Sequence, residues 1–326
     1  MTTYKGIKGF AIQNRSSDPT IFDTGQVWYN STSKVFKVTT GTVASAASWA
    51  TGGNLTTGRN RAAASGTLTV GLVFGGNNPS GSPTKIAATE EYNGTIWTGG
   101  GSLATARQSL AGAGTQTAAL AIGGSDGSYP YPVSNVEEYN GSAWTGGGNL
   151  VTGVTGAGGC GLQTAGLCCG GYGPGDPITT TQEYNGSSWT TSGTMNSARY
   201  LMGAAGIQTS ALTFGGIQPQ TDAVEEYNGS SWTSVQTLPA SKQMMSGAGA
   251  NSTSVVAFGG EPASTTALIY NGTTWAATAS MGTARYATAS AGTTVSCFAT
   301  GGGPSAKTNT EEFLGEVIAQ KTITTN

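Results

Sequence analysis

Carboxylates and cysteines are the first candidates for chemistry in this 326-residue chain, which contains no histidine. The commonest general base and the imidazole ligand preferred by zinc and copper are therefore missing. The four cysteines, Cys160, Cys168, Cys169 and Cys297, show no C-x-x-C spacing, so neither a thiolate metal site nor a redox pair is expected. We predict no catalytic, cofactor-binding or metal-binding residues, and hence no cofactor.

Pairs of glutamates recur, at Glu90-Glu91, Glu137-Glu138, Glu225-Glu226 and Glu311-Glu312. Neighbours on a strand face opposite sides, so the two carboxylates of a pair cannot cooperate as those of a glycosidase do. A glycan-active enzyme would need carboxylates from different repeats, and the candidates are Asp126, Asp176, Asp222 and Glu261. We expect a protein that is not an enzyme, with a glycan-active enzyme as an alternative.

A repeated motif indicates the elements that must position these residues. E-Y-N-G-x-x-W ends in Trp97, Trp144, Trp189 and Trp232, and a variant with Ile269 in place of glutamate ends in Trp275. Trp49 has the same phase without the motif before it. Ten residues after each tryptophan stand, in order, Arg59, Arg107, Val154, Arg199, Lys242 and Arg285, and about sixteen residues later comes a Gly-Gly pair. Six copies in phase predict a repeat architecture.

The local chemistry of each copy predicts four strands. Asn-Gly suits a type I′ hairpin turn between the tyrosine and tryptophan strands. A β-leaning segment ends at Gly-Gly, and the Gly/Ala-rich segment before it suits an inner strand near a central axis. Because successive tryptophans are 43 to 48 residues apart, each copy matches one propeller blade.

These residues resemble a kelch-repeat β-propeller: a Gly-Gly doublet, then tyrosine and tryptophan at fixed separation, with arginine before the inner strands. The resemblance covers about residues 49 to 313 and implies an all-β, six-bladed propeller of four-stranded antiparallel blades, with a seventh partial blade possible. We predict an N-terminal docking arm over residues 1–40 and the propeller over residues 41–326. The last blade lacks its outer strand, which we expect from residues 34–49, with residues 317–323 as the alternative.

The N-terminal segment carries a second, shorter resemblance. Its G-F-A-I-Q-N-R and G-Q-V-W-Y-N-S-T stretches resemble the leading segments of bacteriophage virion proteins of the tail-fibre and adhesin type. That resemblance implies a location on the exterior of the virion, multiple copies in a larger assembly, and other virion proteins as partners of the arm.

Composition excludes some partners. Only 9% of residues are charged and the formal net charge is −2, so no basic field attracts nucleic acid or an acidic membrane. No apolar run is long enough for a transmembrane helix, and no standard secretion leader is expected at the N-terminus.

Residues that do not repeat are the best candidates for binding. The repeated arginines could ring a channel and bind an anion, but we expect Arg59, Arg107, Arg199 and Arg285 to tie adjacent blades together. We likewise expect the six tryptophans to pack between blades, the Asn-Gly-Ser/Thr sequons to be turns rather than glycosylation sites, and Cys168 and Cys169 to lie on opposite faces of a strand. The loops after Gly-Gly vary in length, and we predict ligand or partner contacts from Asn77, Asn78, Asp126, Tyr129, Tyr131, Tyr172 and Asp176.

The sequence therefore predicts a non-enzymatic structural protein of a phage particle whose propeller binds a host-surface glycan or protein. The alternatives are a purely structural decoration or connector subunit, and a cellular kelch scaffold.

Overall fold

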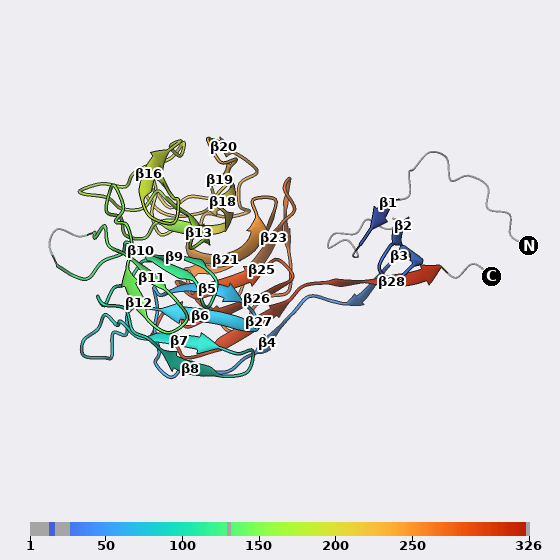
Figure 1. Cartoon of the computed structure of the whole chain (residues 1–326), viewed down its shortest axis with the longest axis horizontal. Coiled ribbons are helices and arrows are strands. Elements are labelled where there is room, and N and C mark those ends of the chain that lie inside the picture. Colours follow the sequence, from blue (N-terminus) through green and yellow to red (C-terminus); the bar gives the residue numbers. More distant parts are fainter. Residues whose placement is uncertain (1–12, 17–26, 129–131, 324–326) are drawn as a thin grey trace, which may run out of the picture. The chain divides into compact units, whose positions relative to one another are not determined.

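The computed structural model describes residues 13–16, 27–128 and 132–323, and every regular element in them is a β-strand (Figure 1). The chain divides into two compact units. One contains Met1–Ala47 together with Gly315–Asn326, and the other, the repeat unit, is Ser48–Leu314. Among the described residues, 41–47 and 315–323 group with the N-terminal segment, whereas the sequence analysis assigned them to the propeller.

The smaller unit contains one four-stranded sheet in the order β1-β2-β3-β28. Its strands are β1 (Gln13–Arg15), β2 (Val27–Asn30), β3 (Val35–Ser45) and β28 (Val317–Ile323). β2 and β3 form the expected antiparallel hairpin, whereas β1 pairs with β2 in parallel. Trp28 is fully buried in this sheet, and Asn30 Oδ1 accepts the backbone N–H groups of Thr32 and Ser33 in the hairpin turn.

The repeat unit consists of six four-stranded antiparallel sheets, numbered here as repeat sheets 1 to 6 in chain order. Their first strands are β5 (Ala63–Thr67), β9 (Ala111–Gly114), β13 (Gly158–Leu162), β17 (Gly203–Ile207), β21 (Gln243–Asn251) and β25 (Ala289–Thr293). Their second strands are β6 (Val70–Phe74), β10 (Ala119–Ile122), β14 (Ala165–Cys169), β18 (Ser210–Phe214), β22 (Ser254–Glu261) and β26 (Ser296–Thr300).

The third strands carry the repeated tyrosine or its phenylalanine counterpart, and the fourth carry the tryptophan. The third strands are β7 (Thr89–Tyr92), β11 (Val136–Tyr139), β15 (Thr181–Tyr184), β19 (Val224–Tyr227), β23 (Ala267–Tyr270) and β27 (Thr310–Leu314). The fourth strands of repeat sheets 1 to 5 are β8 (Trp97–Gly100), β12 (Trp144–Gly146), β16 (Trp189–Ser192), β20 (Trp232–Ser234) and β24 (Trp275–Ala277).

The arrangement is propeller-like, because the first strands contact one another in cyclic order. β5 contacts β9, each following first strand contacts the next, and β25 contacts β5 again. Small residues permit this approach: a Cβ added to Gly112 would lie 2.7 Å from the carbonyl oxygen of Ala64, and one added to Gly159 would lie 2.6 Å from Cβ of Ala111. The Gly/Ala-rich strands are thus the inner strands, as the sequence predicted.

Repeat sheet 6 takes its fourth strand from the N-terminal side of the repeat unit. β4 (Ser48–Thr51) pairs with β27, placing Trp49 opposite Phe313. The predicted N-terminal closure is confirmed, and the alternative strand, β28, pairs with β3 instead.

The Asn-Gly hairpins form, but with a different turn from the one predicted. At Asn93-Gly94 only the glycine has a positive φ, of 88°, and the other four Asn-Gly turns behave alike. Asn93 N–H donates to the carbonyl of Ile96, so Gly94 is the first central residue, as in a type II′ turn rather than type I′. Asn93 Oδ1 accepts the N–H groups of Thr95 and Ile96, which explains asparagine at this position.

The tryptophans lie between neighbouring repeat sheets, and their indole N–H groups bond the sheet that precedes them. Trp144 donates to Thr89 Oγ1 at 2.9 Å, Trp232 to Thr181 at 2.8 Å, and Trp97 to Thr310 at 2.9 Å across the point of closure. Val136 occupies the equivalent position in repeat sheet 2, which precedes the sheet of Trp189. In the described part of the chain, Trp189 Nε1 accordingly has no acceptor although it is buried.

We predict that Val136→Thr stabilises the fold by about 1 kcal/mol, because it offers an acceptor to a buried donor that lacks one. Urea denaturation of the full chain measures this change. Val224→Thr is the matched control, since Trp275 in the next sheet already donates to the carbonyl of Gln236. Equal effects of the two substitutions would contradict the prediction.

Candidate functional site

The repeat unit has two different faces, set by the direction of its strands. Connections from second to third strands and from fourth to first strands lie on one face, here called the loop face. The tight hairpins, including Asn-Gly, lie on the other, here called the hairpin face. Leu314 at the end of β27 pairs with Ser48 at the start of β4, so both connections to the smaller unit leave from the hairpin face.

A closed ring of backbone hydrogen bonds surrounds the axis on the loop face. Each repeat sheet contributes one residue to this ring, two positions after the repeated arginine or the residue that replaces it. The N–H of each ring residue donates to the carbonyl of the equivalent residue in the preceding repeat sheet, at 2.7 to 3.0 Å. The ring residues are Arg61, Ser109, Gly156, Leu201, Met244 and Ala287. All six have φ between 51° and 63°. This left-handed conformation costs a non-glycine residue about 1 kcal/mol or more, and here it aligns N–H and C=O along the ring.

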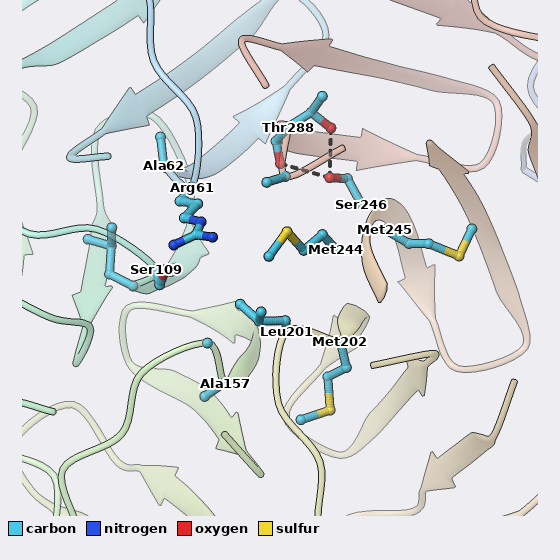
Figure 2. Close-up of a pocket in the computed structure, with 13 residues that line it drawn as sticks. Arg61, Ala62, Ser109, Ala157, Leu201, Met202, Met244, Met245, Ser246 and Thr288 are labelled. Carbon is cyan, nitrogen blue, oxygen red and sulfur yellow. Dashed lines mark hydrogen bonds between the residues drawn. The ribbon is translucent and has the colours of Figure 1, made fainter. Parts of the chain in front are cut away.

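The ring forms the mouth of an axial cavity of about 100 Å³ (Figure 2). Leu201, Met202, Met244 and Met245 give it an apolar side, and Arg61 is its one charged lining residue among those described. Below the mouth the axis is lined by the backbone and small side chains of the six first strands.

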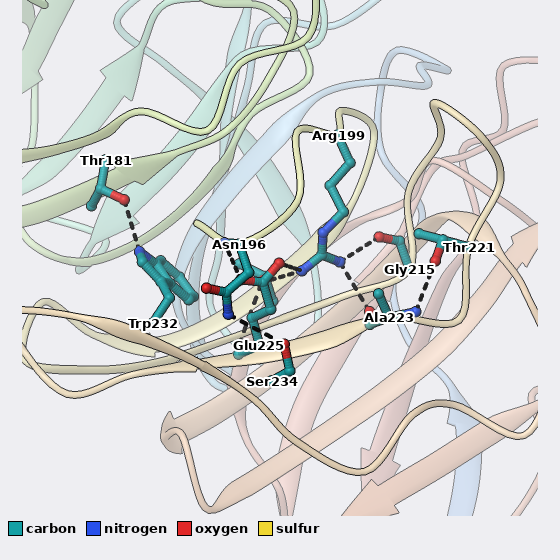
Figure 3. Close-up of polar contacts among 10 residues, drawn as sticks. Thr181, Asn196, Arg199, Gly215, Thr221, Ala223, Glu225, Trp232 and Ser234 are labelled. Carbon is teal, nitrogen blue, oxygen red and sulfur yellow. Dashed lines mark hydrogen bonds and ion pairs between the residues drawn. The ribbon is translucent and has the colours of Figure 1, made fainter. Parts of the chain in front are cut away.

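The repeated arginines do not line this cavity. Arg199, for example, is buried, and its Nη1 donates to the carbonyls of Gly215 and Ala223 at 2.7 and 2.9 Å (Figure 3). Its Nη2 donates to Glu225 Oε1 at 3.0 Å, and Glu225 Oε2 accepts the N–H of Asn196.

Arg59, Arg107 and Arg285 repeat this arrangement with Glu90, Glu137 and Glu311. Burial lowers the pKa of each arginine, and the partner carboxylate opposes that shift. The expectation that these side chains tie adjacent blades together is wrong, because each bonds strands of its own repeat sheet. The backbone carbonyl of the arginine, not its side chain, bonds the neighbouring repeat sheet. The carbonyl of Arg107 in repeat sheet 2, for example, accepts the N–H of Gly76 in repeat sheet 1 at 2.7 Å.

In the two repeat sheets that lack this arginine–glutamate ion pair, both partners are replaced. Val154 replaces arginine in repeat sheet 3, and there Gln182 replaces the glutamate. Lys242 replaces arginine in repeat sheet 5, and there Leu268 replaces the glutamate. An unpaired buried carboxylate would be costly, which explains why the glutamate is absent where the arginine is absent. Lys242 keeps its charge, but it is only partly buried and its Nζ donates to the carbonyl of Pro262.

The second carboxylate of each pair joins neighbouring repeat sheets. Tyr139 Oη donates to Glu91 at 2.5 Å, and Tyr227 Oη donates to Glu183 at 2.5 Å. Tyr184 donates likewise to Glu138, and Tyr92 donates to Glu312 across the point of closure. The two carboxylates of a pair thus face opposite sides, as predicted.

Between repeat sheets 5 and 6 both partners of the tyrosine–glutamate hydrogen bond are replaced. Ile269 replaces the glutamate, and Phe313 replaces the tyrosine. Between repeat sheets 4 and 5 the glutamate and the tyrosine are both present, but Glu226 accepts a bond from Ser252 Oγ instead of from Tyr270.

The predicted binding residues that the structure describes belong to the loop face, and several of them order their own loops. Asn78 Oδ1 accepts the N–H of Ser80, and Asp126 Oδ1 accepts that of Ser128. Tyr172 Oη donates to the carbonyl of Gly175, while its ring packs edge-on against Tyr200 at 5.4 Å between centroids.

Two of the remaining predicted residues, Asn77 and Asp176, lie in described loops of the loop face. Asn77 pairs through its backbone with Asn60 and Lys85, and Asp176 is exposed. Tyr129 and Tyr131 lie outside the described residues.

The cysteines are buried and unpaired with one another by disulfides. Cys168 and Cys169 belong to different hydrophobic clusters, which matches the predicted alternation. Burial raises the pKa of the Cys160 and Cys168 thiols to about 12. Within residues 13–16, 27–128 and 132–323, no group of three or more potential ligands could hold a metal ion.

No known family model and no curated protein sequence matches this chain. The described residues include no helix that is long and apolar enough to cross a membrane.

Sequence reasoning missed Arg61 and Tyr200 on the loop face. A signal for Arg61 was present, because the position two residues after the repeated arginine is apolar or small in every other copy. The contact between Tyr200 and Tyr172 had no such signal, since it joins the first-strand connection of one repeat sheet to a loop of another.

We predict that Arg107→Val destabilises the fold by about 3 to 5 kcal/mol, because it leaves Glu137 buried without its cation. Adding Glu137→Gln should recover part of that loss, since the double variant reproduces the Val154 and Gln182 combination. A double-mutant cycle by chemical denaturation measures the recovery. Asp176→Asn, which neutralises an exposed carboxylate, is the control, and a further loss in the double variant would refute the coupling.

We also predict that the fold loses stability between pH 10 and pH 12. Burial, followed by the bond to a neighbouring glutamate, raises the pKa of Tyr92, Tyr139 and Tyr227 from 10.0 to about 12. The folded chain then holds protons that the unfolded chain has released, so the stabilisation is complete below pH 10 and is lost as the pH rises to 12.

Urea midpoints across this pH range and absorbance at 295 nm test the titration. Tyr139→Phe should reduce the slope of stability against pH, whereas Tyr172→Phe, a tyrosine on the loop face, should leave it unchanged. Equal slopes in all three proteins would contradict the assignment.

Proposed function

We propose that this chain is a six-bladed, kelch-like β-propeller that serves as a non-enzymatic display module on the exterior of a bacteriophage particle. Its loop face would bind a host-surface glycan or protein, and its smaller unit would hold it to other virion proteins in multiple copies. The observation that carries the proposal is the difference between the two faces of the repeat unit. Both connections to the smaller unit leave from the hairpin face, so the variable loops lie on the face free of these connections.

The scaffold contacts support a binding role for the loops. The repeated carboxylates are occupied by arginine, backbone N–H or tyrosine groups, which hold the sheets in place. The side chains that differ between repeats gather on the loop face, with Tyr172 and Tyr200 packed as an aromatic pair. A rigid scaffold that presents variable loops is the usual basis of recognition, and tyrosine offers stacking together with hydrogen bonding.

The phage assignment rests on the resemblance of the N-terminal segment to virion proteins. A second function, that of a structural connector, is favoured by the hairpin face. Val70, Leu162, Ile207 and Val295, in the hairpins between first and second strands, are exposed on that face by 42 to 50%. Such residues would suit contact with another virion subunit.

Binding of the labelled full-length chain to bacterial host cells tests the display function. We expect saturable binding that blocks phage adsorption, and a loss of at least tenfold in affinity when Tyr129, Tyr131 and Tyr172 are all changed to alanine. Leu162→Ala with Ile207→Ala, on the hairpin face, is the matched control and should bind normally. Absence of binding by the folded wild-type chain, with reduced particle incorporation of the hairpin-face variant, would favour the connector instead.

A further inference from the structure

We propose that the axial mouth on the loop face binds the carboxylate of a terminal acidic sugar, with Arg61 as the residue that recognises it. This inference names a ligand class for the proposed display function and rests on that function. The site is the cavity ringed by Arg61, Ser109, Gly156, Leu201, Met244 and Ala287.

The charge at this mouth comes from one side chain. Arg61 reaches into the opening from repeat sheet 1, across from Leu201 and Met244 (Figure 2). Among the described residues no carboxylate pairs with it and no acceptor bonds its guanidinium, in contrast to the buried Arg59 two residues before. An arginine free of partners presents a planar fork of donors that fits a carboxylate through two hydrogen bonds.

The scaffold does not require a cation at this position. The ring bonds use only backbone atoms, and serine, glycine, leucine, methionine and alanine fill the same position in the other five repeat sheets. Those backbone groups are also occupied by the ring itself, so they contribute no donors to a ligand. Recognition of an anion therefore falls to the Arg61 side chain.

The remaining lining residues suggest what carries the carboxylate. Ser109 adds a hydroxyl beside Arg61, whereas Ser246 and Thr288 bond one another. Leu201 and Met244 offer apolar surface, which suits the C–H face of a sugar ring. A cavity of about 100 Å³ admits a terminal group but not the body of a polymer. A uronic or sialic acid at the end of a chain satisfies all three features.

The experiment titrates the full-length chain with glucuronate and N-acetylneuraminate, using calorimetry and saturation-transfer NMR. The comparison probes are glucose, methyl glucuronate (the methyl ester, which has no charged carboxylate), acetate and a short peptide with a free C-terminal carboxylate. We expect an acidic sugar to bind more tightly than each of the four comparison probes. Arg61→Gln should weaken that binding by about tenfold or more, and Arg61→Lys should weaken it less, because lysine keeps the charge but loses the fork.

Lys307→Gln is the matched control, since it removes a cation from the loop connection of repeat sheet 6 without touching the cavity. An unchanged thermal midpoint shows that Arg61→Gln remains folded. Equal binding of methyl glucuronate, acetate or the peptide, or unchanged affinity in Arg61→Gln, would overturn the inference. Host-cell binding that persists in Arg61→Gln would then leave the display function standing without this ligand, whereas absence of host-cell binding in the wild type would remove the function itself.

Discussion

The closed ring of six backbone hydrogen bonds is the constraint on which the repeat unit depends. Each ring residue must hold a left-handed φ to donate to one neighbour and accept from the other, and five of the six do so without being glycine. The cost of that conformation is offset because each bond also fixes the start of an inner strand beside the axis. Closure at Arg61 and Ala287 makes the last repeat sheet the neighbour of the first.

Around that ring, two sets of polar pairs hold the sheets, and both change only as pairs. Inside a repeat sheet the arginine and glutamate are kept together or replaced together, as Val154 and Gln182 show. Between repeat sheets the tyrosine and glutamate follow the same rule, as Ile269 and Phe313 show. The reason is the same in both cases, because a buried charge or hydroxyl without its partner costs more than an apolar substitute of both.

The scaffold thus separates what must repeat from what is free to vary. Buried pairs and interface tryptophans occupy the repeated positions, while loop lengths and the ring side chains differ from sheet to sheet. The start of β4 and the end of β27 lie on the hairpin face, so neither connection to the smaller unit leaves from the loop face. Among the described residues Arg61 has no partner in the axial mouth, and this departure from the repeat is the basis of the proposed recognition role.

The sequence by itself determined the four-stranded repeats, their inner and outer strands and the N-terminal origin of the last strand. Those features follow from the local periodicity of the repeats and from the position of Trp49, whose spacing to the next arginine and Gly-Gly pair matches that of the other tryptophans. It did not determine the turn type at Asn-Gly, because the choice between asparagine and glycine as the first central residue depends on hairpin register. Nor could it show that arginine bonds its own sheet, that β28 joins β3, or that Arg61 faces the axis. Each of these depends on contacts between residues far apart in the chain, which only the closed tertiary arrangement brings together.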